Sequence, residues 1–269
     1  VVVTADAGAD DAACAVATEL AQHAWDLRPR YRTTVTSVGD AVRAAADAAA
    51  GRRPPVILAD TADNPGGGAP GNTTFLLREL LDAGVDDVVM GLQCDPGVVR
   101  AAWDGGIGAH LRCTFNEGSA RPLAVPLTAT ATVTALTAAP LVPTKGVYRN
   151  MQRHPGRCCA LELVGPSGNR IRIAVSSHKV QCADDDTLLH VGIDPSAARV
   201  VVVKSRGHFR AGFAHLFGGE QVVEVGAPGV ATAVIGDVDW ANIPRPVFPL
   251  DEIDTWVPVV SVHGAKVAT

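Results

Sequence analysis

A long glycine-rich loop is the segment of this sequence best suited to hold a ligand. It lies between an apolar run at 56–58, which predicts a buried strand, and an apolar-periodic segment at 75–81, which predicts a helix closed by Gly84. Asn72 or Thr73 is a good N-cap for that helix. Glycine lets backbone N–H groups approach a ligand, and a helix N-terminus favours negative charge. The loop residues that we expect to bind substrate are Asp63, Asn64, Gly66, Gly67 and Gly68.

A second polar segment follows the β-branched run at 200–203, which is typical of a parallel strand covered on both faces. Ligands in open α/β sheets collect at the carboxyl ends of strands, so this turn and the glycine-rich loop should border one crevice. Its cations could pair with a carboxylate, and its histidine is the one candidate catalytic residue, able to donate or shuttle a proton. A solvated basic turn is the alternative. The residues are Lys204, Ser205, Arg206, His208 and Arg210.

Other interpretations of the loop are weaker. Gly66, Gly68 and Gly71 fit the dinucleotide pattern G-x-G-x-x-G, but six residues separate the strand from the first glycine, and no acidic residue ends the next apolar run. No Gly-Lys-Ser/Thr follows, so a Walker A loop is excluded. A connector without a ligand stays open as an alternative.

The remaining polar residues give no compact catalytic or metal-binding set. His208 and His215 lie seven residues apart, too far to share a metal as i, i+4 ligands do. The acidic run 184–186 predicts a solvated loop. No G-x-S-x-G elbow supports a serine hydrolase. The six cysteines include no C-x-x-C pair and suggest buried thiols in a reducing cytoplasm.

Composition bounds the partners. The 269 residues, 47% of them hydrophobic, can bury a substantial core, and a net charge of -5 argues against a nucleic-acid surface. No apolar run approaches the length of a membrane span. We therefore expect neither nucleic acid nor membrane as a partner, and a cytoplasmic location.

The order of the expected helices and strands predicts an α/β fold. It has a mainly parallel sheet flanked by helices and a β-rich, hairpin-containing middle section. Apolar residues at helical spacing after Asp10 and again over 38–50 precede the strand at 56. Alternation at 127–133 and a turn between 161–164 and 170–173 indicate strands and a hairpin. The expected portions are 1–110 (α/β with the loop), 111–190 (β-rich), 191–251 (returning α/β) and 252–269 (extended tail).

The loop, with Ala59 and Asp60 before it, resembles the hallmark segment in the C-terminal half of the MlrC-like proteins, a metallopeptidase family named for microcystin degradation. Where the family carries an aspartate after Ala-Pro-Gly, this chain has Asn72, which keeps an N-cap and removes the carboxylate. Further blocks agree in order and spacing, at 91–96, 176–181, 192–195, 201–211 and 244–251.

The resemblance implies a substrate-pocket-forming portion of a zinc-dependent hydrolase of amide or peptide bonds. The family's metal ligands belong to an N-terminal half that this sequence does not contain, and none of the eight histidines has an aspartate two residues before it. We therefore expect zinc in the intact enzyme, no metal and no activity in this chain alone, and as partners the N-terminal metal-binding half and a small peptide or amide. A homo-oligomer is left open. The alternatives are a non-catalytic small-anion binding module and an NAD-dependent oxidoreductase.

Overall fold

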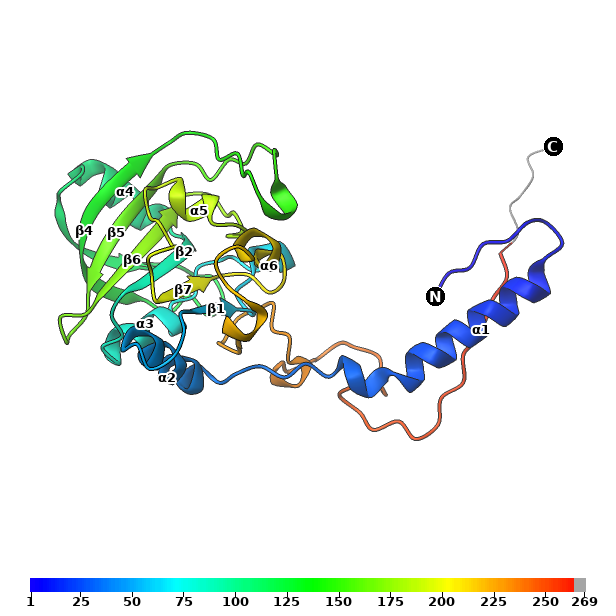
Figure 1. Cartoon of the computed structure of the whole chain (residues 1–269). Helices are drawn as coiled ribbons and strands as arrows, with labels where there is room; N and C mark the ends of the chain where they lie inside the picture. Colours follow the sequence, from blue (N-terminus) through cyan, green and yellow to red (C-terminus); the bar gives the residue numbers. More distant parts are fainter. Residues whose placement is uncertain (264–269) are drawn as a thin grey trace. The chain divides into compact units, whose positions relative to one another are not determined.

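The computed structural model describes residues 1–263 and divides the chain into two compact units. One unit, Val35–Ala233, holds the whole β-sheet and the helices packed on it (Figure 1). The other combines Val1–Thr34 with the segment that starts at Val234. The two candidate segments both belong to the first unit.

Eight strands form one sheet in the order β3-β4-β5-β6-β2-β7-β1-β8. From β6 to β8 all neighbours are parallel, whereas β3, β4, β5 and β6 pair antiparallel. The sheet is therefore mixed, and our expectation of a mainly parallel sheet was wrong, because the β-rich middle section extends the same sheet. The strands are β1 (Val56–Asp60), β2 (Val88–Cys94), β3 (His110–Phe115), β4 (Leu127–Thr137), β5 (Cys158–Val164), β6 (Arg170–Ser176), β7 (Val200–Val203) and β8 (Val222–Val225).

Helices cover both faces of the parallel strands because successive strand residues point to opposite sides. Leu58 and Val202 belong to a core under the longer helices, whereas Ile57 and Val201 belong to a second core with Phe209. The predicted α/β class is confirmed. The first face carries α2 (Val38–Ala49), α3 (Phe75–Asp82) and α4 (Pro96–Gly105), and the second carries α5 (Asp186–Leu189) and α6 (Phe209–Phe213).

Local capping explains most helix starts, with one correction. The Ser37 hydroxyl accepts the Asp40 N–H at the start of α2, and Asp95 accepts the Val98 N–H at the start of α4. The expected cap of α3 by Asn72 or Thr73 was wrong: the N-cap is Thr74, which makes no side-chain cap bond. The side chains of Asn72 and Thr73 form hydrogen bonds with other groups of the protein, which are described below.

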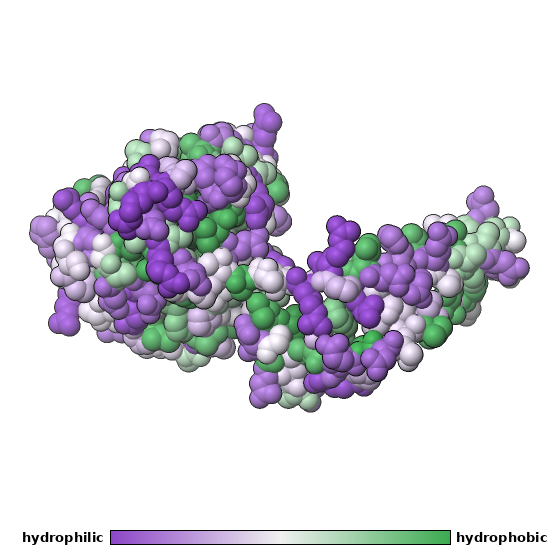
Figure 2. Space-filling view, turned by 60° about the horizontal axis from the view of Figure 1, so that its bottom comes forward, coloured by the Kyte–Doolittle hydropathy of each residue, from purple (hydrophilic) through white to green (hydrophobic). Residues whose placement is uncertain are grey.

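The second unit contains α1 (Asp10–Asp26), the amphipathic helix predicted after Asp10. Trp25 stacks on Trp256 with ring centroids 4.9 Å apart and meets Phe248 edge-on. None of its described residues is fully buried, and Leu20 is 47% exposed. Hydrophobic residues reach the surface of the molecule in Figure 2. Across residues 1–263, no helix combines the length and the apolar character needed to cross a membrane.

Candidate functional site

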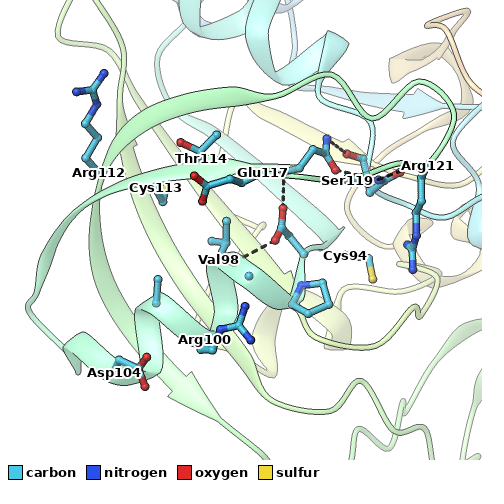
Figure 3. Close-up of a pocket in the computed structure, with 16 residues that line it drawn as sticks. Cys94, Val98, Arg100, Asp104, Arg112, Cys113, Thr114, Glu117, Ser119 and Arg121 are labelled. Carbon is cyan, nitrogen blue, oxygen red and sulfur yellow. Dashed lines mark hydrogen bonds between the residues drawn. The ribbon is translucent and has the colours of Figure 1, made fainter.

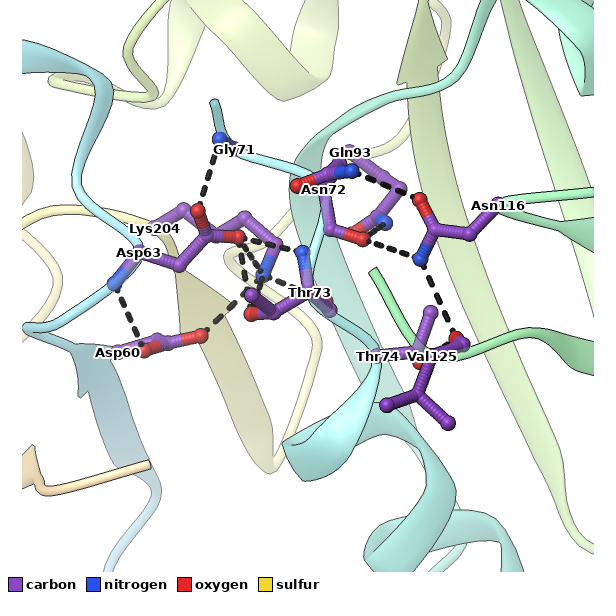
Figure 4. A network of polar contacts seen from close by, with 10 residues as sticks. All are labelled: Asp60, Asp63, Gly71, Asn72, Thr73, Thr74, Gln93, Asn116, Val125 and Lys204. Carbon is purple, nitrogen blue, oxygen red and sulfur yellow. Dashed lines mark hydrogen bonds and ion pairs between the residues drawn. The ribbon is translucent and has the colours of Figure 1, made fainter. Parts of the chain in front are cut away.

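The ammonium of Lys204 is buried at the carboxyl ends of β7 and β1, where it joins the two candidate segments (Figure 4). Its Nζ donates to Asp63 Oδ2 at 2.8 Å, to the Thr73 carbonyl at 2.8 Å and to Asp60 Oδ2 at 3.2 Å. Lys204 is only 1% exposed. The expectation that its charge faces a substrate carboxylate therefore needs correction, because its donors are occupied inside the protein.

Two carboxylates and one ammonium share this buried space. Burial alone would lower the pKa of Lys204, but the charges of Asp60 and Asp63 raise it above its ordinary value, so the ammonium stays charged. Burial raises the pKa of Asp60, and the neighbouring Asp63 adds to this, against the opposing effect of Lys204. One buried ammonium thus pairs with two carboxylates, at 2.8 Å from Asp63 and 3.2 Å from Asp60.

The carboxylate of Asp63 fills the anion position that the glycine-rich loop provides. Its Oδ1 accepts the Gly71 N–H at 2.8 Å, and its Oδ2 accepts the Thr73 N–H at 2.7 Å and the Thr73 hydroxyl at 2.9 Å. The Gly66 N–H donates to Asn64 Oδ1. The next three amides along the loop, at 67, 68 and 69, donate to loop carbonyls. The loop is therefore folded around an internal anion.

Gln181 connects the loop to the turn after β7. Its Nε2 lies 2.8 Å from Asn64 Oδ1 and 2.8 Å from Ser205 Oγ. Its Oε1 accepts the Tyr148 hydroxyl at 3.1 Å and lies 2.9 Å from Nδ1 of His208. The structure thus confirms that the two segments lie side by side at one edge of the sheet.

The exposed part of this edge consists of loop backbone and the outer residues of the turn. Gly66, Gly67 and Gly68 are exposed, Asn64 is half-buried, and Arg206 and His208 are exposed. Asp63, Lys204 and Ser205 are buried. Arg210 forms an ion pair with Glu224. The predicted residues therefore separate into a surface set and a supporting set.

A cavity of about 580 Å³ lies beside the loop, between the end of β2, the start of α4 and strand β3 (Figure 3). Asn72 and Cys94 line it on the side of the glycine-rich loop, and the Cys94 N–H donates to the Gly71 carbonyl at 2.8 Å. Burial raises the pKa of Cys94, against the opposing effect of Arg121, so this thiol is not an activated nucleophile. Three arginines also line the cavity: Arg100, Arg112 and Arg121.

Asn72 belongs to a second buried network in the wall of this cavity (Figure 4). Its Nδ2 donates to Asn116 Oδ1, and its carbonyl accepts from Gln93 Nε2 and Asn116 Nδ2. Within the described residues, Asn72 Oδ1 and Gln93 Oε1 have no hydrogen-bond partner. The side chain of Asn72 therefore contacts the side-chain amide of Asn116 and does not cap the backbone of α3.

The acidic run 184–186 was wrongly expected to be a solvated loop. Asp184 and Asp185 are buried, and burial raises the pKa of Asp184 to about 6. Lys145 and His215 both contact Asp185, at 3.0 Å each. The acidic run is buried because it lies at the start of α5, where Asp184 accepts hydrogen bonds from the Thr187 N–H and hydroxyl.

The described residues contain no group of three His, Cys, Asp or Glu side chains that could hold a metal ion. The donor sets among residues 1–263 therefore do not fit a metal centre. Four residues that organise the edge were not predicted as site residues from the sequence: Gln181, Tyr148, Thr73 and Asn116. For Gln181 one signal existed: it stands between Val180 and Cys182, an apolar setting that favours a buried, hydrogen-bonded amide.

Comparison with known proteins gives three consistent matches. Microcystinase C from Sphingomonas sp is 32% identical over 174 residues, which cover 64% of this chain and 32% of that protein. A crystal structure of a proposed metallopeptidase from Mesorhizobium sp. BNC1 shares the fold, with a TM-score of 0.75 at 22% identity. That match covers 92% of this chain and 47% of the other. The chain thus spans less than half the length of either relative.

The third match is to a family. The sequence model of the MlrC C-terminus matches residues 58–242, which include both candidate segments and Gln181. This stretch is more than half of the chain and contains β2 to β8 and the end of β1. The chain therefore belongs to the MlrC C-terminus family.

Proposed function

We propose that this chain forms the substrate pocket of a zinc-dependent hydrolase of amide or peptide bonds. Its family, and the metallopeptidase that shares its fold, support this assignment. The metal would be held by the part of these relatives that this chain does not span, as the N-terminal half of the same protein or as a partner. When bound there, zinc would activate a water molecule.

The observation that carries the proposal is the joining of loop and turn through Gln181 at one edge of the sheet. Parallel strands deliver their carboxyl ends to this edge, where α/β proteins bind ligands. We assign substrate contact to Asn64, to the backbone carbonyls of Gly66, Gly67 and Gly68, whose N–H groups donate within the loop, and to Arg206 and His208. Asp63, Lys204 and Ser205 would hold these groups in place, and Arg210 would anchor the turn through Glu224.

A small-anion binding module is the second candidate, because three arginines line the cavity, although Asp95, Asp104 and Glu117 line it as well. Arg100 and Arg121 line the same 580 Å³ space as the start of α4. Calorimetric titration of the chain with phosphate, with and without Arg121→Gln, distinguishes this function, because only a module would bind phosphate tightly without hydrolysing an amide. A nicotinamide cofactor has less support, since the loop amides that would contact its phosphates donate internally.

We also propose a cytoplasmic location and leave self-association open. All six cysteines are free thiols. Burial raises the pKa of Cys158 and Cys159 to about 12, which keeps them protonated and inert. Thiols that neither pair nor react suit a reducing compartment.

The proposed pocket is tested on protein that contains both halves. Arg206→Met should lower kcat/KM for a peptide with a free carboxylate by roughly 10- to 100-fold, the effect of losing one charged hydrogen bond. Arg170→Met is the matched control: Arg170 is exposed at the start of β6, the opposite end of the strands, and should leave kcat/KM unchanged. Equal losses in the two variants would count against a pocket at this edge.

A further inference from the structure

We propose that Gln181 fixes the imidazole of His208 with its proton on Nδ1, so that Nε2 is the acceptor offered to a substrate N–H group. Gln181 is then a positioning residue and His208 a substrate-binding residue. The group that meets Nε2 rests on the proposed function. The position of the proton rests only on hydrogen bonds within this chain.

The backbone N–H of Gly66 fixes the orientation of the two side-chain amides. The backbone N–H of Gly66 can only donate, and it lies 3.0 Å from the side chain of Asn64. The Asn64 atom that faces it must therefore be the carbonyl oxygen, Oδ1. This oxygen also lies 2.8 Å from the amide of Gln181, so the Gln181 atom that faces it must be the donor Nε2.

The second hydrogen of this amide agrees with the same orientation. Nε2 donates to Ser205 Oγ at 2.8 Å, so both of its hydrogens are used. The carbonyl Oε1 then points to the other side, where it accepts the hydroxyl of Tyr148 at 3.1 Å. His208 Nδ1 lies 2.9 Å from the same oxygen. An oxygen without a hydrogen can only accept, so Nδ1 must carry the proton.

A neutral imidazole carries one N–H, so the proton on Nδ1 leaves a lone pair on Nε2. His208 is exposed, and no hydrogen bond to its Nε2 occurs among the residues that the structure describes. The ring of Tyr148 meets the His208 ring edge-on, with centroids 5.9 Å apart and planes 88° apart. This contact and the bond to Gln181 hold the ring plane.

The loop keeps Gln181 in this position. Gln181 is 3% exposed, and a β-carbon on Gly66 would overlap with its Oε1. The glycine at 66 is therefore required by the close approach of the amide. Hydrogen bonds connect the Gly66 backbone to Asn64, Asn64 to Gln181, and Gln181 to His208. Through them the glycine-rich loop helps to set the tautomer of His208.

This geometry determines which ligand group His208 can receive. A lone pair on Nε2 accepts a hydrogen bond from a peptide N–H and does not bind a carboxylate, which has no hydrogen to donate. Arg206, two residues earlier, is a cation suited to the carboxylate. A peptide or amide with an N–H next to its carboxyl end matches both groups.

The tautomer is read from the chemical shifts of the two imidazole nitrogens of His208. They are measured in a long-range proton–nitrogen correlation spectrum at alkaline pH, where an imidazole is neutral. The wild-type chain should show Nδ1–H. Gln181→Met removes the acceptor and should shift the tautomer ratio towards Nε2–H by roughly fivefold or more, the effect of one hydrogen bond. Gln93→Met is the matched control, because Gln93 is a buried amide at the same edge that does not contact His208.

An Nε2–H tautomer in the wild-type chain would overturn the assignment without any variant, so the test does not depend on Gln181→Met folding. An equal shift in Gln93→Met would show that Gln181 has no specific effect. The substrate part has its own probe. N-acetylglycinamide should perturb the Nε2 shift, and its fully N-methylated analogue should not. Equal perturbation by both, or by neither, would reject the role in binding an N–H and leave the tautomer standing.

Discussion

At the scale of single residues, Asp60 and Asp63 contact the same ammonium but have different surroundings. Asp63 accepts two backbone N–H groups and the Thr73 hydroxyl in addition to Lys204. Asp60 accepts Lys204 and one backbone N–H, that of Asp63, at 3.3 Å. The first carboxylate holds the loop in shape, whereas burial raises the pKa of the second.

The two aspartates should therefore differ in mutational cost. Asp63→Asn places an amide NH₂ group opposite groups that can only donate, and it leaves Lys204 without its nearest anion. We therefore expect the free energy of unfolding to fall by about 3–5 kcal/mol. Asp60→Asn keeps an acceptor for Lys204 and should cost about 1 kcal/mol or less at pH 7. Urea denaturation measures both. Equal losses would mean that Asp63 has no special role.

The pH dependence of the Asp60 variant follows from the sign of its shift. The pKa of Asp60 is raised in the folded state, so between 3.8 and the raised value the folded protein holds a proton that the unfolded chain has released. Folding stability from this group is then complete below pH 3.8 and falls as the pH rises through that interval. Asp60→Asn should remove this decrease when denaturation is repeated across the pH range.

At the scale of elements, the glycines of the loop are not equivalent. Gly66 has no room for a side chain because Gln181 lies against it. Gly67 does not have a positive φ, and a β-carbon there would lie 3.3 Å from the end of the Asn64 side chain and 3.5 Å from the β-carbon of Ala231. The glycine that the loop requires is therefore Gly66, and Gly71 is a second, with φ of 73° and Pro65 beside it.

Gly66→Ala should destabilise the protein by about 1–3 kcal/mol, as overpacking does, because the buried Gln181 must move. Gly67→Ala, the matched control, should stay within about 0.5 kcal/mol. Thermal denaturation compares the two variants with the parent. If the two substitutions had the same effect, the close packing of Gln181 on the loop would be contradicted.

Periodicity and turn residues were sufficient to predict most elements. The helices at 10 and 38, the strand at 56 and the hairpin of β5 and β6 are local patterns, and the structure confirms them. The extension of one sheet by antiparallel strands depends on long-range pairing, which no local pattern encodes.

For the site, too, local features could be predicted from the sequence and long-range contacts could not. Glycines and charges identified the two segments, and strand topology placed them at one edge. Whether a charge faces solvent or a partner depends on residues distant in sequence: Lys204 meets Asp63 across 141 positions, and Gln181 meets Asn64 across 117. The burial of Lys204 could therefore not be predicted from its neighbours in the chain.

At the scale of the whole molecule, a sheet-bearing unit of known family is accompanied by a unit without a buried core. All fully buried side chains among residues 1–263 lie in Val35–Ala233. The described residues offer no metal-binding cluster, and the relatives are more than twice as long as the stretch they share with this chain. Our proposed function divides the pocket and the metal between two halves of one protein.

The most direct test of this division is to measure metal content and hydrolysis together. After dialysis against zinc, the chain alone should hold no stoichiometric zinc by elemental analysis, since a catalytic zinc needs about three protein ligands, and it should not hydrolyse a peptide amide. Protein that contains both halves should hydrolyse the amide, and a chelator should abolish that activity. A tightly bound zinc together with amide hydrolysis in the chain alone would contradict the account.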